Sequence, residues 1–210
     1  MTARGESEFN AEDSASHEFG QFKWTVEASR KCSQYFKSFI ADLSKPDNPL
    51  IEDPSDAAKL KIGEEEIWVS KKVLGFHSPF FRNLFTRDIK EKAEDSYELQ
   101  DINMDEFVHF LAVIHNIRIP IDQNSVAYLL ELGEQFLCKA VMIQCEDFLL
   151  SADAKDIGLL QKFCYANRFD LDQLATKTVE KMDVEDLKMV PRAVYSLFAK
   201  DLIEQKLNMC

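Results

Sequence analysis

The sequence predicts an α+β fold, a small β-sheet flanked by α-helices, followed by a C-terminal extension that is entirely helical. Two short alternating runs on either side of Gly63 have the pattern of a β-hairpin, and helical periodicity dominates from Asn103 onwards. Of the 210 residues, 46% are apolar and sixteen are phenylalanine. A chain of this length and composition is able to bury one sizeable core with a further helical unit attached.

The net negative charge of the chain argues against two classes of binding partner. The chain has 37 acidic and 25 basic side chains, for a formal net charge of -12. Nucleic-acid phosphates and anionic membranes both require clustered lysine and arginine, so we expect neither as a partner. No apolar run approaches the roughly 20 residues of a membrane helix, and acidic residues stand where a signal peptide would be apolar. The expected location is therefore inside the cell, in the cytoplasm, the nucleus or both.

The reactive residue types do not form a recognisable site. The sequence has no G-x-G-x-x-G, P-loop or nucleophile elbow, and His109 and His115 are six residues apart on one predicted helix, so they face different directions. The cysteines are odd in number and widely spaced, which favours neither disulfides nor a zinc site. Three of them lie in helical patterns and are expected to be small buried residues: Cys138, Cys145 and Cys164. We therefore expect no enzyme activity, no cofactor and no metal.

The N-terminal quarter is expected to lie outside the main domain. Residues 1–20 are acidic and poor in apolar groups, which predicts a disordered tail. Residues 21–55 are interpreted as an N-terminal segment and a proline-rich linker. Within them FKWTVEA, from Phe22, alternates like a strand, whereas YFKSFIADL, from Tyr35, fits either a helix or a second strand. The stretch from Lys45 to Pro54 is expected to be exposed and mobile.

The next elements are short. KLKI and EIWVS alternate on either side of the turn GEE, which predicts a hairpin. KKVLGFHSPFFRNLF predicts two short helices that are broken near Ser78-Pro79, because proline disfavours a helical conformation in the residue before it. SYELQ, from Ser96, predicts a third short strand.

Three helices are expected to follow as neighbours, because the connections between them are short. NMDEFVHFLAVIHN starts with Asn103 as a cap and Glu106 three residues later, a variant of the capping box. Each helix has an apolar face. The three faces are Phe107, Phe110, Leu111 and Ile114; Val126, Leu129, Leu130, Gly133 and Leu137; and Val141, Cys145, Phe148 and Leu149.

The C-terminal region predicts further helices. AKDIGLLQKFCYANRF and DLDQLATKTVEKM each carry an apolar face, DVEDLKMV predicts a short helix, and Pro191 is expected to open a last helix through Leu207. The two faces are Ile157, Leu160 and Cys164; and Leu171, Leu174, Ala175, Thr178 and Met182.

Residues 56–151 resemble the BTB/POZ domain. The resemblance is carried in order by SDAAKLKIGEEEIWVSKKVLGFHSPFFRNLF, SYELQDINMDEFVHFLAVIH and NSVAYLLELGEQFLCKAVMIQCEDFLL. Asp56, the Lys-x-Val-Leu and His-Ser-Pro-Phe-Phe run and the Cys-Glu-x-Phe-Leu ending look like landmarks of this family. The resemblance implies the BTB/POZ fold with a helical extension over residues 154–208, and a protein-interaction module that dimerises with itself or with another BTB protein.

The resemblance also implies a candidate partner, the ubiquitin-ligase subunit cullin-3. BTB domains that recruit cullin-3 often carry an apolar-x-Glu motif in the loop before the third strand, and Ile89-Lys90-Glu91 occupies that place in TRDIKEKAED. The isoleucine would anchor in a partner pocket while the carboxylate fixes its orientation. Alternatively, Ile89 packs on its own domain and Glu91 is one charge among many. The helices after Ala154 similarly resemble an extension that completes a cullin-binding surface, or they form a generic cap on the last BTB helix.

The candidate self-association surface lies on the predicted helix from Lys71 to His77, since BTB dimers pack helices near the start of the domain together. Val73 and Phe76 are the candidate seam; alternatively, both face the monomer core. Adaptors of this family usually carry a separate substrate-binding domain, such as a MATH, kelch or zinc-finger region, and none is recognisable, although FKWTVEA is faintly similar to a MATH strand. The substrate therefore stays unknown. Two alternatives to a cullin-3 adaptor remain, an oligomerisation scaffold without a cullin and an adaptor similar to elongin C.

Overall fold

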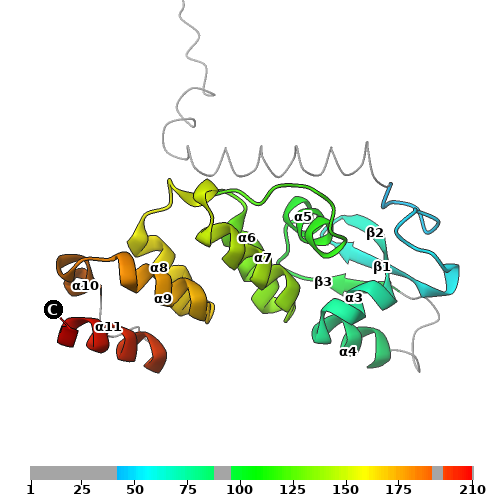
Figure 1. Ribbon diagram of the computed structural model, residues 1–210. Helices are drawn as coiled ribbons and strands as arrows, with labels where there is room; N and C mark the ends of the chain where they lie inside the picture. Colours follow the sequence, from blue (N-terminus) through cyan, green and yellow to red (C-terminus); the bar gives the residue numbers. More distant parts are fainter. Residues whose placement is uncertain (1–41, 88–95, 191–195, 210) are drawn as a thin grey trace, which may run out of the picture.

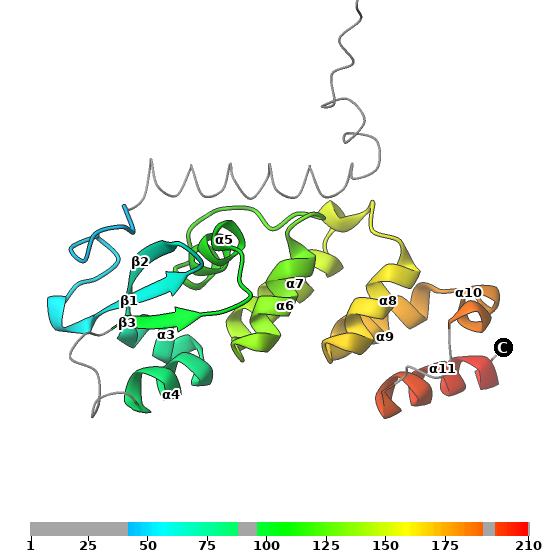
Figure 2. The same ribbon diagram turned by 180° about the vertical axis from the view of Figure 1, so that it is seen from behind.

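The computed structural model describes residues 42–87, 96–190 and 196–209 (Figure 1). The strands lie at one end of the molecule and the last helices at the other, with two helix pairs between them; Figure 2 shows the same order from behind. The elements are β1 (Ala57–Ile62), β2 (Glu65–Ser70), α3 (Lys71–His77), α4 (Pro79–Arg87), β3 (Ser96–Leu99), α5 (Met104–Ile114), α6 (Val126–Gln135), α7 (Lys139–Leu150), α8 (Leu159–Arg168), α9 (Asp172–Lys181), α10 (Val184–Met189) and α11 (Leu197–Met209).

The three strands form a sheet in the order β2-β1-β3. β1 pairs antiparallel with β2 across a turn in which Gly63 has a φ of 59°, a left-handed conformation that glycine adopts without steric cost. β3 pairs in parallel with β1, with Lys59 opposite Ser96 and Ile62 opposite Leu99. The predicted hairpin and third strand are therefore confirmed, and the sheet with its flanking helices confirms the α+β class.

Most residues of the proline-rich stretch are exposed as expected, but buried side chains within it and just before it attach it to the sheet. Leu43, Asn48 and Ile51 are buried, and the Trp68 N–H of β2 donates to the Leu43 carbonyl at 2.7 Å. The Asn48 amide donates to the Trp68 carbonyl at 3.2 Å and to the Lys45 carbonyl at 2.9 Å. Because β2 is at the edge of the sheet, these contacts satisfy backbone groups that an edge strand otherwise leaves open.

The predicted break at Ser78-Pro79 is present, and Ser78 connects it to a distant part of the chain. Its hydroxyl donates to the Phe136 carbonyl at 2.5 Å and accepts from the Phe81 N–H at 3.1 Å, so it also caps α4. Phe81 and Phe136 are buried with ring centroids 4.8 Å apart. The break therefore places α4 directly on the aromatic core.

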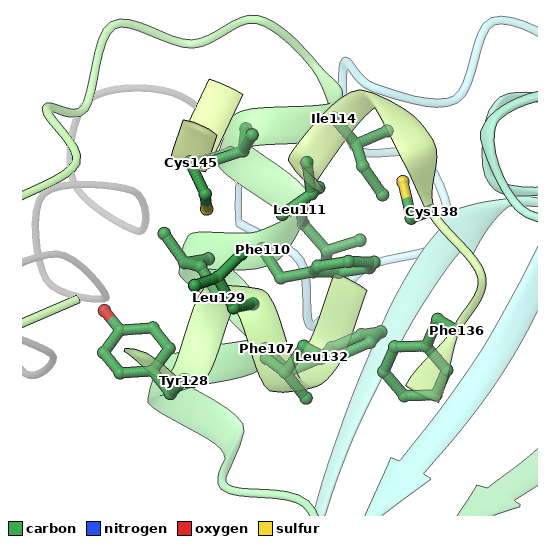
Figure 3. Packing of buried hydrophobic residues seen from close by; sticks show 14 of the residues in the cluster. Phe107, Phe110, Leu111, Ile114, Tyr128, Leu129, Leu132, Phe136, Cys138 and Cys145 are labelled. Carbon is green, nitrogen blue, oxygen red and sulfur yellow. The ribbon is translucent and has the colours of Figure 1, made fainter. Parts of the chain in front are cut away.

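Helix α5 is the central element of the core. Asn103 caps it as predicted, accepting from the Glu106 N–H at 3.1 Å. The predicted face of α5 is buried, but so is the rest of the helix from Phe107 to Ile114. Figure 3 shows its side chains packed between residues of α6, α7 and the segment that joins them. The helix therefore contributes on all sides to one core, rather than through a single stripe.

The connection between α6 and α7 differs from the prediction. α6 ends at Gln135, and Leu137 lies in the connecting turn with a φ of 53° and 58% of its surface exposed. Phe136 takes the buried position instead. Gly133, on the predicted face, lies where the two helices approach, because a Cβ there would be 2.7 Å from the Met142 sulfur. In α7, Val141, Cys145 and Leu149 are buried as expected, and Phe148 is half-buried.

The predicted buried face of α8 is wrong at two positions. Leu160 is 46% exposed and Cys164 is exposed, whereas Phe163 and Ala166 are buried. The face predicted for α9 is buried throughout, from Leu171 to Met182.

The last helix begins at Leu197 within the described residues. Pro191, which was expected to open this helix, lies outside the described residues. Residues 1–41, with the strand or helix expected there, also lie outside them.

Side chains from other helices satisfy the ends of α9. Its first turn has no side-chain cap of its own, and Glu146 of α7 accepts from the Leu174 N–H at 2.9 Å. At its other end, the Lys206 ammonium of α11 donates to three carbonyls, those of Val179, Glu180 and Met182. Helix termini leave such groups unsatisfied, so these contacts fix α9 between α7 and α11.

A buried histidine gives the fold a pH dependence. The Nδ1 atom of His109, on α5, is 2.6 Å from the Tyr128 hydroxyl, and among the described residues its Nε2 has no hydrogen-bond partner. Burial lowers the pKa of His109 from its ordinary value of 6.5 to about 4. As the pH falls below 6.5 the unfolded chain takes up this proton before the folded one, so stability is lost down to about pH 4.

We expect His109 to contribute a loss of about 2 kcal/mol in the free energy of unfolding between pH 7 and pH 5. His115 acts in the same direction, because burial lowers its pKa too. Urea unfolding of His109→Gln at the two pH values measures how much of this loss comes from His109, because glutamine does not titrate but retains a polar partner for Tyr128. An unchanged pH difference in this variant would contradict the assignment.

Candidate partner-binding surface

The start of α3 is fixed by two buried polar side chains. The Ser70 hydroxyl accepts from the Val73 N–H at 3.1 Å, and the Asp56 carboxylate accepts from the Lys72 N–H at 2.8 Å. Ser70 also donates to Asp56, which links the two groups. Because the first turn of the helix is held in this way, the direction of each α3 side chain is set by its position in the helix.

The short helix therefore has distinct sides. Leu74 is fully buried, and Val73 is half-buried against the main core. Phe76 points away from the core, with 78% of its surface exposed. A single exposed apolar side chain is normal on a protein surface, but large aromatic rings are common anchors of protein interfaces, which makes Phe76 a candidate.

A shallow cavity of about 500 Å³ opens beside Phe76, between α3 and α4. We call it the α3–α4 cavity; its lining residues are Lys71, Lys72, Gly75, Phe76, Arg82, Phe85 and Thr86. Arg82 is held at the wall by its Nε, which donates to the Gly75 carbonyl at 2.9 Å. The Lys72 ammonium forms an ion pair with the Asp53 carboxylate at 3.4 Å. The cavity thus combines two phenylalanines with three cationic side chains, in a chain that is acidic as a whole.

The structure separates the two predicted seam residues. The Phe76 ring is exposed and can contact a partner without rearrangement. Only part of the Val73 side chain is exposed, because the rest packs against the core. The other residues that line the cavity were not predicted from the sequence: Lys71, Lys72, Arg82, Phe85 and Thr86. The helical spacing could have indicated them, because residues four apart share a helix face. Lys72 and Phe76 have this spacing, and so do Arg82 and Thr86.

The predicted cullin motif Ile89-Lys90-Glu91 lies outside the described residues, between α4 and β3. Among the described residues, no group of three or more His, Cys, Asp or Glu side chains is arranged to hold a metal ion. Cys138 and Cys145 are buried, and burial raises the pKa of the Cys145 thiol to about 12, far from thiolate chemistry. No helix in the described part of the chain has the length and apolar character needed to cross a membrane.

Residues 52–153 match the BTB/POZ domain family. BTB and MATH domain-containing protein 38 of Caenorhabditis elegans is 32% identical over 132 residues, which cover 62% of this chain and 34% of that protein. BTB and MATH domain-containing protein 15 of the same organism is 27% identical over 180 residues, 85% of this chain and 64% of that protein. The BTB domain of zebrafish PATZ1 aligns with 61% of this chain and 92% of its own length, at 17% identity and a TM-score of 0.38.

Residues 52–153 therefore belong to the BTB/POZ domain family, and this part of the chain is a protein-interaction module. The chain spans only about a third to two-thirds of the length of these two nematode relatives.

Proposed function

We propose that the chain is a self-associating adaptor that connects a bound protein to a cullin-3 ubiquitin ligase. The observation that carries the self-association is the exposed Phe76 ring on a helix whose first turn is rigidly capped. In a two-fold dimer the same patch meets its own copy. Phe76 would then be buried against the partner's α3 helix, with Val73 at the edge of the seam.

The cullin contact is assigned to Ile89-Lys90-Glu91, with Ile89 as the apolar anchor and Glu91 as the orienting carboxylate. The C-terminal extension supports this proposal, because α8 and α9 continue the main core rather than forming a separate unit. Ala166, Phe169 and Leu174 belong to the same buried cluster as α5, and the Lys162 ammonium donates to the Leu149 carbonyl of α7 at 2.7 Å. A rigid continuation of the domain of this kind is suited to extend a binding surface.

The substrate is a protein of unknown identity. The nematode relatives are named for a MATH domain in addition to the BTB domain, and the sequence from Phe22 to Ala28 is faintly similar to one MATH strand. Residues 21–51 are too few for a whole sandwich of this type, so we assign substrate recognition to no residue of this sequence.

A pull-down with the tagged full-length chain, probed for cullin-3 and for other cullins, tests the adaptor assignment. Capture of cullin-3 alone is the expected result. Capture of a different cullin would favour the elongin-C-like alternative, and capture of none would leave an oligomerisation scaffold.

A further inference from the structure

The side chains that line the α3–α4 cavity are complementary to a ligand that is both acidic and aromatic. Its apolar part is formed by Phe76 and Phe85, and its cationic part by Lys71, Lys72 and Arg82. The chain has twelve more acidic than basic side chains, yet three cationic and no acidic side chains line this cavity; one of the cations, Lys72, is paired with Asp53 beside it. A phenylalanine flanked by carboxylates matches both parts at once, since the ring is taken out of water while the carboxylates meet cations.

The chain contains such a segment. Glu6 to Asp13 reads ESEFNAED, with Phe9 among four acidic residues and no basic one. We propose that this segment docks in the α3–α4 cavity of its own chain, with the Phe9 ring beside Phe76 and its carboxylates against Lys71, Lys72 and Arg82. Phe19 is the less suitable candidate, because Glu18 is the only acidic residue within five positions of it.

Chain length permits the contact within one copy. About 30 residues separate Asp13 from Asp42, the first described residue, and a stretch of that length spans up to roughly 100 Å when extended. A domain of about 100 residues has a radius of gyration of only about 13 Å. Because the segment is covalently attached, docking in the same copy is an intramolecular step, which favours it over docking between copies at micromolar protein.

This docking goes beyond the proposed function and has a consequence for it. Phe76 belongs both to the cavity and to the proposed dimer seam, so the docked segment would compete with self-association. The docking itself does not require a dimer, and a chain that sediments as a monomer is expected to show it equally.

Zero-length carbodiimide cross-linking of the full-length chain, followed by peptide mass spectrometry, tests the proposal. We expect amide links from Glu6, Glu8, Glu12 or Asp13 to Lys71 or Lys72, formed within one copy in a mixture of ¹⁴N- and ¹⁵N-labelled protein. The exposed ion pair between Lys188 and Glu185, at 2.8 Å, serves as an internal control of the reaction.

Phe9→Ala is expected to reduce the ratio of docked to undocked chain at least about tenfold, because burying an aromatic ring contributes one to two orders of magnitude to such an equilibrium. Phe19→Ala is the matched control and should leave the links unchanged. Higher salt should weaken them, since screening reduces the attraction between the charges.

Three results would overturn the proposal. They are equal linking of the acidic segment to remote lysines such as Lys155, links formed between differently labelled copies, and links from Lys71 or Lys72 to Glu91, Glu94 or Asp95 in place of the N-terminal residues. An unchanged yield in Phe9→Ala would do the same.

Discussion

Replacing Phe81 with alanine is expected to lower the free energy of unfolding by about 3–5 kcal/mol, the range for a large aromatic residue removed from a packed core. The side chain is fully buried. Its ring centroid lies 4.8 Å from that of Phe136, 5.2 Å from Phe80 and 6.1 Å from Phe107. The alanine variant leaves a cavity among rings that belong to α4, α5 and the α6–α7 connection, so the loss should be felt across the whole domain.

Chemical denaturation followed by circular dichroism measures this effect, with Phe198→Ala as the matched control. Both changes remove the same side chain, but Phe198 on α11 is 41% exposed, so its removal should lower the free energy of unfolding by clearly less. Equal destabilisation by the two substitutions would contradict the core assigned here. Both variants are compared at the same protein concentration.

Replacing Ile89 with alanine is expected to weaken binding to cullin-3 by about ten- to a hundredfold. Burying an isoleucine in a partner's pocket stabilises a complex by roughly 1.5–3 kcal/mol, and each 1.4 kcal/mol is about tenfold in affinity. Glu91→Ala should have a smaller effect, because a carboxylate at the rim of an interface remains partly solvated.

Titration calorimetry with cullin-3, together with a thermal melt of each variant, separates the two explanations for Ile89. An anchor loses affinity with an unchanged melting temperature, whereas an isoleucine that packs on its own domain lowers the melting temperature and leaves the affinity intact. Leu197→Ala is the control for removal of an exposed aliphatic side chain, since Leu197 is 80% exposed on α11. Full binding by Ile89→Ala would refute the anchor.

Local signals account for the parts of the fold that the sequence predicted well. The hairpin around Gly63 follows from alternation with a period of two, and the break at Ser78-Pro79 follows from the steric restriction that proline places on the residue before it. The Asn103 cap follows from a side chain that reaches only its own helix. None of these features depends on what lies elsewhere in the chain.

The predictions that were wrong concern residues whose burial depends on contacts with distant parts of the chain. Leu137 continues the apolar period of α6, but the helix ends two residues earlier, because Phe136 turns into the aromatic core and Leu137 adopts a positive φ. Cys164 fits a helical face, but α9 packs on the side of α8 that carries Phe163. The prolines near Leu43 suggested a linker, and nothing local reveals that Trp68 supplies backbone partners for that segment.

The candidate surface was predictable only in part. The spacing of Val73 and Phe76 places them near each other on a helix, but the capping of α3 by Asp56 and Ser70 decides which of them is exposed. The cationic side of the cavity depends on how α4 turns back along α3, which places Arg82 beside Gly75. That geometry is not encoded in any short motif.

Sedimentation of the chain at tens of micromolar, compared with Phe76→Asp, tests the central claim that this face of α3 joins two copies. Both proteins carry Phe9→Ala, so that the N-terminal segment does not compete for the face. We expect the parent protein to sediment with twice the 24.2 kDa chain mass and the Phe76→Asp variant with the mass of one chain. The melting profile of the Phe76→Asp variant should remain that of a folded domain, since a charge at an exposed position does not disturb the core. A parent protein that remains a clean monomer, or a Phe76→Asp variant that dimerises equally well, would contradict the claim.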